Sequence, residues 1–166
     1  MVSPELLRRY PFFSCLSHDQ LVTLAMAGEE ISVDAEHYFF HEGENLRNLF
    51  FVIEGEIDIG VRLTVKGAEN GVREQILGHF IEEIVHVSSI TPGNIFAWSA
   101  LIPPNISTAS AKSAVPSRVV VFDCEELTRA FQEDCPFGYL MLQKVAGAVR
   151  QRLRDMRVQS LAFITL

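Results

Sequence analysis

The histidines are the first candidates for a functional role in this 166-residue chain, because they could bind a metal ion. His37 and His41 are four residues apart, in a stretch that the sequence predicts to be extended. Four residues of a strand span about 13 Å, whereas a zinc ion needs its ligand nitrogens within about 2.1 Å. We therefore expect both histidines to be structural or exposed. His79 and His86 flank a predicted turn and could meet there, but no cysteine or carboxylate pattern accompanies them, so we predict no metal site.

The residues that could catalyse a reaction do not form a known pattern. The chain has no Gly-x-Ser-x-Gly, no His-Glu-x-x-His and no phosphate-binding loop ending in Gly-Lys-Ser/Thr. The adjacent acids Glu82 and Glu83 would point to opposite faces of a strand, and Glu125 and Glu126 lie at a predicted helix start. Neither pair is arranged for acid–base catalysis. We therefore predict no catalytic residue and a protein that is not an enzyme.

A third group of candidates lies between residues 92 and 111, where the chain reads PGNIFAWSALIPPNISTASA. This composition predicts a loop, one helical turn and a strand of small residues. The small side chains of Ser99 and Ala100 would let a ligand approach the peptide backbone. Trp98 could fill a pocket there or stack on a flat ligand.

Composition and charge limit the classes of function. With 48% hydrophobic residues, the chain can form one domain, 1–166, with a substantial core. With a net charge of −7, the surface as a whole does not attract nucleic acid. No apolar run reaches the ~20 residues of a membrane span, and the N-terminus does not resemble a signal peptide. The scattered Cys15, Cys124 and Cys135 argue against a disulfide framework, so we expect a cytoplasmic protein.

The elements that would position these residues fall into three regions. Residues 1–30 are predicted to form helices, because Ser17 and Gln20 match a capping box and Gly28 could end the helix that follows. Residues 31–122 are predicted to form short strands at regular spacing, which is typical of a sandwich or barrel. Glycines 43, 55 and 60 would break these strands, and residues 65–80 would form a long polar hairpin tip. Residues 123–166 are predicted to be helical.

The last predicted helix is long and carries an apolar stripe. Its stripe residues are Leu142, Val145, Val149, Leu153 and Met156, spaced 3, 4, 4 and 3. The first two turns are expected to pack on their own domain. Beyond about Arg152 a single domain has little left to cover the stripe, which predicts a homodimer through this helix. Residues 136–166 have a net charge of +4, which fits either a solvated face or contact with the acidic body of the same protein or with an acidic protein partner.

This order of elements resembles the cyclic-nucleotide-binding domain of catabolite-activator-type regulators, kinase regulatory subunits and gated channels. The resemblance spans about Leu6 to Arg157 and rests on FFHEGENLRNLFFVIEGEIDI, SITPGNIFAWSALIPPNISTASAKS and RVVVFDCEELTRAF. It is interrupted at Ala35-Glu36, where the family usually has a glycine before the acid, and at residues 65–80. It implies a mainly β, α+β fold: an antiparallel β-roll of the jelly-roll type, flanked by N-terminal helices and a long C-terminal helix.

The resemblance also implies a ligand site with altered chemistry. In the family, a glutamate accepts from the ribose 2′-hydroxyl and an arginine pairs with the cyclic phosphate. Here Phe-Gly-Glu corresponds to Phe96-Ala97-Trp98, and the arginine position to Ser107. Losing two charge-assisted hydrogen bonds of about 1.5–3 kcal/mol each predicts an affinity lower by about 10²–10⁴. The predicted pocket residues are Phe96, Ala97, Trp98, Ser99, Ala100, Ser107 and Thr108, and the tail arginines, above all Arg150 and Arg154, are candidates to supply a cation.

The sequence therefore predicts a non-catalytic regulatory module. It would bind a cyclic nucleotide weakly, or another small anionic or aromatic ligand, and the bound ligand would shift the long helix relative to the roll. A ligand-free interaction module is the first alternative, and a cupin-like metal-dependent enzyme is a weaker one; a haem ligated by histidine or cysteine also stays open. The chain ends at Leu166, about where transcriptional relatives add a helix-turn-helix. We therefore expect no membrane partner, and no direct DNA binding unless the chain is a fragment of a longer regulator. Its apolar end, LAFITL, would fit a fragment and would equally fit packing against a partner.

Overall fold

The computed structural model describes residues 1–66 and 80–162. The chain begins with three short helices: α1 (Pro4–Arg8), η1 (Pro11–Phe13) and α2 (His18–Met26). The predicted capping box is confirmed, because the Gln20 N–H donates to Ser17 Oγ and the Ser17 N–H donates to Gln20 Oε1. Gly28 does not cap α2: the cap is Ala27, and Gly28 already begins strand β1.

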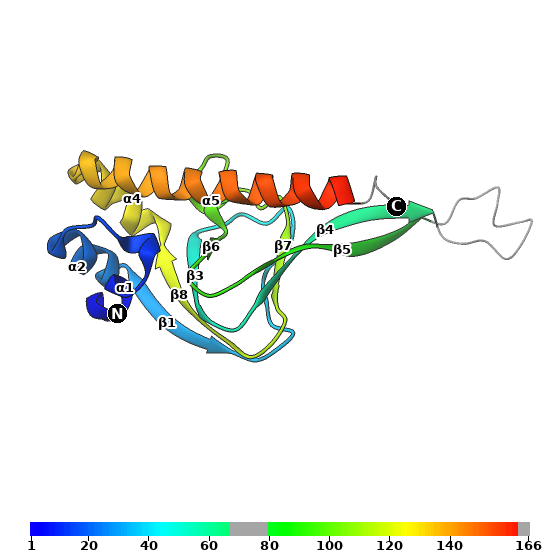
Figure 1. Ribbon diagram of the computed structural model, residues 1–166, viewed down its shortest axis with the longest axis horizontal. Helices are drawn as coiled ribbons and strands as arrows, with labels where there is room; N and C mark the ends of the chain where they lie inside the picture. The colour runs from blue at the N-terminus through cyan, green and yellow to red at the C-terminus, as the bar shows by residue number, and fades with distance from the viewer. Residues whose placement is uncertain (67–79, 163–166) are drawn as a thin grey trace, which may run out of the picture.

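The body of the domain is an antiparallel β-roll made of two four-stranded sheets (Figure 1). One sheet has the order β1 (Gly28–Val33), β8 (Ser117–Asp123), β3 (Asn48–Glu54) and β6 (Ile95–Phe96). The other has the order β2 (Tyr38–Phe40), β7 (Ser110–Ser113), β4 (Ile57–Lys66) and β5 (Phe80–Ile90). Every named strand pair is antiparallel, so the predicted roll is confirmed, although the sheets do not close into a barrel.

Two of the three predicted glycine breaks are turns. Gly43 and Gly55 have φ angles of +87° and +93°, which only glycine adopts without strain. A side chain at Gly55 would also collide with Ser117, since its Cβ would lie 2.1 Å from the Ser117 hydroxyl oxygen. Gly60 does not break a strand. It lies inside β4 at a bulge next to Ile59, where the register against β5 shifts by one residue.

The predicted long hairpin is formed by β4 and β5. The two strands pair from Ile57↔Ile90 to Lys66↔Phe80, and the hairpin extends well beyond the rest of the roll (Figure 1). The predicted tip began at Val65 and ended at Phe80, but these ends belong to β4 and β5, and residues 67–79 lie outside the described residues. The consequence for function is that β5 leads directly from this hairpin into the 92–111 segment.

The core contains two groups of aromatic rings between the sheets and the N-terminal helices. Phe51 is fully buried against the rings of Tyr10 and Phe13, at centroid distances of 4.8 and 4.7 Å. Phe50 stacks on Phe96 at 4.9 Å with an angle of 13° between the rings. This second group fixes β6 against β3, and so sets where the helical turn that follows β6 begins.

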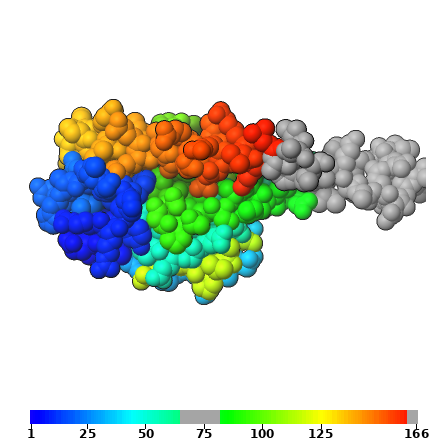
Figure 2. Space-filling view, viewed as in Figure 1, coloured from blue at the N-terminus to red at the C-terminus, as the bar shows by residue number. Residues whose placement is uncertain are grey.

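The C-terminal region consists of α4 (Cys124–Glu133) and α5 (Cys135–Ala162). The carboxylate of Asp123 caps α4 by accepting from the N–H groups of Glu125 and Glu126. With 28 residues, α5 is about 42 Å long, and it runs along the molecule from the N-terminal helices to the β4–β5 hairpin (Figures 1 and 2). Among the described residues, none of the helices is both long and apolar enough to cross a bilayer.

The predicted apolar stripe of α5 divides between two faces of the helix. Val145 is only 1% exposed and packs into the core, as predicted for the first turns. Leu142 was expected to pack with it but is 56% exposed, and Leu153 is 47% exposed. The residues on the outer side, with Ala146 in place of Val145, are Leu142, Ala146, Val149, Leu153 and Met156; Val149 is partly buried and the other four are exposed. Their spacing of 4, 3, 4 and 3 is that of a heptad repeat, which is typical of a helix that pairs. We call these five residues the exposed stripe.

Candidate functional site

The 92–111 segment forms the predicted loop, helical turn and small-residue strand. After β6 comes η2 (Trp98–Leu101), a single 3-10 turn, and the segment then leads into β7. The amide of Asn105 holds the end of this turn, since its Nδ2 donates to the carbonyl of Ala100 at 2.7 Å. The segment is therefore fixed by its own hydrogen bonds as well as by β6.

Ala97 has a left-handed backbone at the start of η2, with φ +62° and ψ +31°. Glycine adopts this conformation freely, while another residue loses about 1–2 kcal/mol. The resemblance aligns Ala97 with a family glycine. The backbone therefore keeps the bend that a glycine would favour, although the glycine itself is absent.

A cavity of about 210 Å³ lies beside η2, between the roll and α5. Six of the seven predicted pocket residues line it: Phe96, Ala97, Trp98, Ser99, Ser107 and Thr108. Ala100 is buried and does not line this cavity; it borders a separate cleft next to α4. The walls that the sequence did not predict include Phe40, Ile59, Val87, Ser88, Ile90, Arg152 and Met156. Most of these are apolar residues of the roll, and two come from α5.

Ser107 occupies the position that the resemblance gives to an arginine, but its hydroxyl is already bonded within the protein. The side chain is 4% exposed. Its Oγ donates to the carbonyl of His41 at 2.6 Å and accepts from the Glu44 N–H at 3.1 Å. The hydroxyl therefore holds the turn at Gly43 against the cavity wall.

Replacing Ser107 with alanine is expected to destabilise the domain by about 1–3 kcal/mol, because the buried hydroxyl gives up two hydrogen bonds to the turn at Gly43, each worth about 0.5–1.5 kcal/mol. Urea denaturation measures the free energy of unfolding. The control is Thr108→Ala at the next, exposed position of the cavity wall, where we expect a change within about 0.5 kcal/mol. Equal stabilities of the two variants would contradict the structural role of Ser107.

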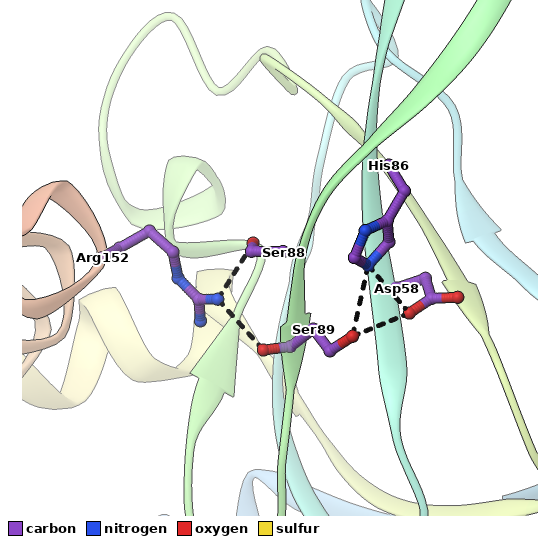
Figure 3. A network of polar contacts seen from close by, with 5 residues as sticks. All are labelled: Asp58, His86, Ser88, Ser89 and Arg152. Atoms are coloured by element: carbon purple, nitrogen blue, oxygen red, sulfur yellow. Dashed lines mark hydrogen bonds and ion pairs between the residues drawn. The ribbon is translucent and has the colours of Figure 1, made fainter. Parts of the chain in front are cut away.

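Arg152 supplies the charge at this cavity (Figure 3). It reaches from α5 to β5, where its Nη1 donates to Ser88 Oγ at 3.1 Å and to the Ser89 carbonyl at 3.3 Å. Its guanidinium carbon lies 6.0 Å from the centroid of the Trp98 ring, within range of a cation–π interaction. Burial lowers the pKa of Arg152 from its ordinary value, while nearby Asp155 opposes this shift.

The prediction that Arg150 or Arg154 would supply the cation is wrong. Both are exposed, because each lies two residues from Arg152 and so points about 200° away around the helix. Arg152 follows the buried Val145 by seven residues and Met141 by eleven, close to two and three helical turns. It therefore lies on the buried face of α5.

Asp58, His86 and Ser89 form a second polar group on the neighbouring strands β4 and β5 (Figure 3). Ser89 Oγ donates directly to Asp58 Oδ1 at 2.9 Å, and His86 Nε2 lies 3.2 Å from both oxygens. In a catalytic triad the imidazole separates the serine from the acid and uses both ring nitrogens. Here one nitrogen faces both partners, so the imidazole is not placed to activate the serine.

The other described histidines lie on the surface, as predicted for His37 and His41. His41 stacks on Tyr38 at 4.5 Å, and His37 meets Phe39 edge-on at 5.2 Å. His79 lies outside the described residues. Within residues 1–66 and 80–162, no three histidine, cysteine or acidic side chains are grouped so as to hold a metal ion.

Comparisons with known proteins agree with this architecture. The family model of the cyclic nucleotide-binding domain matches residues 30–134. A structure from Geobacter metallireducens GS-15, described as a candidate cyclic nucleotide-binding protein, is 31% identical over 92% of this chain and 99% of its own, with a TM-score of 0.74. The sensor domain of the transcriptional regulator DNR from Pseudomonas aeruginosa is 22% identical over 90% of this chain and 95% of its own, with a TM-score of 0.62.

One further structure shares the fold at lower coverage. It is the regulatory domain of PKA from Toxoplasma gondii with cAMP, 20% identical over 76% of this chain and 42% of its own, with a TM-score of 0.57. No curated protein sequence matches this chain. Because the family model covers more than half of the residues, this chain belongs to the family of cyclic nucleotide-binding domains.

Proposed function

We propose that this domain is a non-catalytic sensor whose cavity binds a small ligand but is not tuned for cyclic nucleotides. The observation that carries the proposal is the composition of the cavity wall. Trp98 stands where the family's acid would lie, the hydroxyl of Ser107 is bonded within the protein, and none of the described wall residues is acidic. A ribose hydroxyl would therefore meet no carboxylate acceptor there.

The response of the domain would come from α5. Arg152 and Met156 project from this helix and line the cavity, so a ligand that enters must contact or displace them. A ligand moves a conformational equilibrium only if it binds one arrangement better than the other. The contacts of Arg152 with Ser88 and Ser89 would exist in one arrangement and be exchanged for ligand contacts in the other.

The exposed stripe supports a homodimer as the form in which this response is used. It presents apolar side chains at heptad spacing along a helix that is solvent-exposed on its outer side. Apolar side chains on such a stripe gain stability by packing against an equivalent stripe. A second copy of this chain supplies an equivalent stripe, so a shift of α5 would change the packing of the two copies.

Titration calorimetry with cyclic AMP and cyclic GMP tests the choice of ligand. We expect dissociation constants in the millimolar range or weaker, because two charge-assisted contacts worth about 10²–10⁴ in affinity are absent. A saturating ligand would be visible by thermal unfolding as well, since 100 times the dissociation constant adds about 2.7 kcal/mol. Low-micromolar binding of either nucleotide would overturn the proposal.

A further inference from the structure

The walls of the cavity favour an apolar ligand body. Phe40 and Phe96 are both buried, and their rings are inclined by 28° with centroids 6.3 Å apart. Ile59 and Ile90 add aliphatic surface from the two long strands, and Trp98 adds its indole. Walls of this kind bind through apolar contact, while a few polar groups fix the orientation of the ligand.

The cavity also carries a positive charge that, within the described residues, no carboxylate contacts directly. Arg152 is the one charged residue among the described wall residues, and its hydrogen bonds within 1–66 and 80–162 go to Ser88 and Ser89. Asp155, one turn further along α5, acts on Arg152 electrostatically but accepts its hydrogen bond from Gln151. A guanidinium that is partly removed from water gains most from a carboxylate that bonds it directly. The chemical group that best completes this site is therefore an anion.

The bonds that Arg152 already makes leave part of its guanidinium available. Both recorded hydrogen bonds use Nη1, and they hold the group between Ser88, Ser89 and Trp98. In the described part of the chain, Nε and Nη2 have no recorded hydrogen-bond acceptor. These two nitrogens form one edge of the guanidinium, and such an edge binds the two oxygens of a carboxylate in parallel.

The size of the cavity restricts the ligand further. A dry protein cavity of about 150 Å³ accommodates benzene, and most pockets for larger ligands have about 300–1,000 Å³. The present cavity, with about 210 Å³, accommodates one aromatic ring and a few more atoms.

Building on the proposed function, we infer that the cavity binds a small monocyclic aromatic carboxylate, with the ring between the apolar walls and the carboxylate on the Nε–Nη2 edge of Arg152. Sequence reasoning would place a cation on the long helix but cannot tell which arginine faces the cavity. Trp98, which replaces the family's acid, packs against Arg152 and so belongs to the anchor of the carboxylate.

Three probes separate the parts of this inference in titrations of the full chain. Benzoate has a ring and a charge, benzamide has the ring without the charge, and acetate has the charge without the ring. We expect benzoate to bind at least tenfold more tightly than either of the others, since a charge-assisted contact is worth about tenfold to a hundredfold in affinity. Equal affinities for benzoate and benzamide, or no binding of benzoate, would overturn the inference.

Substitution of Arg152 provides a second test of the inference. Arg152→Met keeps most of the length of the side chain. We expect it to weaken the affinity for benzoate by about tenfold to a hundredfold and to change the affinity for benzamide by less than about threefold. Arg150→Met and Arg154→Met remove the same charge from the same helix at exposed positions and should leave benzoate binding unchanged. An equal loss in all three variants would assign the effect to the general charge of α5 and contradict the inference.

A blocked cavity distinguishes failure of the inference from failure of the proposed function. Ala109→Phe places a ring in the cavity from its wall, with Ser99→Phe as a second choice if the first does not fold. The blocked variant could bind neither benzamide nor benzoate while Arg152→Met still binds both. That result would support the ligand cavity and contradict the role of Arg152 as the carboxylate anchor. Tight binding of cyclic AMP in the calorimetry above would instead remove the proposed function itself.

Discussion

Replacing Trp98 with glutamate and Ser107 with arginine is expected to raise the affinity for cyclic AMP by about 10²–10⁴-fold. The two substitutions return the carboxylate and the guanidinium that the family resemblance places at these positions, and each charge-assisted contact contributes about 1.5–3 kcal/mol. Both positions line the cavity, and the backbone at Ala97 already has the bend of the family's glycine. Calorimetric titration of the purified double variant measures the gain.

The matched control is Trp98→Gln with Ser107→Met. This pair removes the same indole and the same hydrogen bonds from Ser107 to His41 and Glu44, and it introduces side chains of similar length without charge. Urea denaturation of both variants checks that the loss of these hydrogen bonds lowers the free energy of unfolding equally, by about 1–3 kcal/mol. A gain of less than tenfold over this control would mean that the cavity, and not the two missing side chains, excludes the nucleotide.

Introducing glutamate at both Val149 and Leu153 is expected to convert a dimer into monomers. Both residues belong to the exposed stripe, so each copy would bring two carboxylates into an apolar contact. Burying an unpaired charge costs several kcal/mol after relaxation, which weakens association by about 10³-fold or more. Sedimentation velocity or light scattering after size exclusion reports the mass directly.

Glutamates elsewhere on α5 provide the control for this experiment. Gln151 and Val158 are also exposed and on the same helix, but they lie about 200° around it from Val149 and Met156 and so outside the exposed stripe. Gln151→Glu with Val158→Glu adds the same charge and should leave the dimer intact. A wild-type chain that is monomeric at all concentrations, or a Val149/Leu153 variant that still dimerises, would contradict the homodimer.

Local sequence signals predicted much of this fold because their causes are local. The capping box at Ser17 and Gln20 needs only neighbouring residues, and the helix start at Asp123 needs only a side chain that can reach the next two N–H groups. The alternation of Ile57 and Ile59 with polar residues correctly predicted β4. Glycines 43 and 55 marked turns because their φ angles are positive.

The errors come from features that depend on packing between distant segments. Periodicity predicts that α5 has an apolar face, but the rotation of the helix against the roll decides which residues that face contains. For this reason the sequence placed Val145 in the stripe where the structure has Ala146, and favoured Arg150 and Arg154 over Arg152. Gly60 suggested a break, yet it is accommodated by a bulge that pairing with β5 creates.

Arg152 and Leu153 are consecutive residues of one uninterrupted helix, and they face opposite environments: the cavity and the exposed stripe. A rigid helix cannot rotate one of these side chains without rotating the other. In a symmetric pair of chains, occupancy of one cavity would therefore alter the contact surface that the other chain shares. The affinity of the second cavity would then depend on the first, so that the two sites respond cooperatively to the concentration of a single ligand.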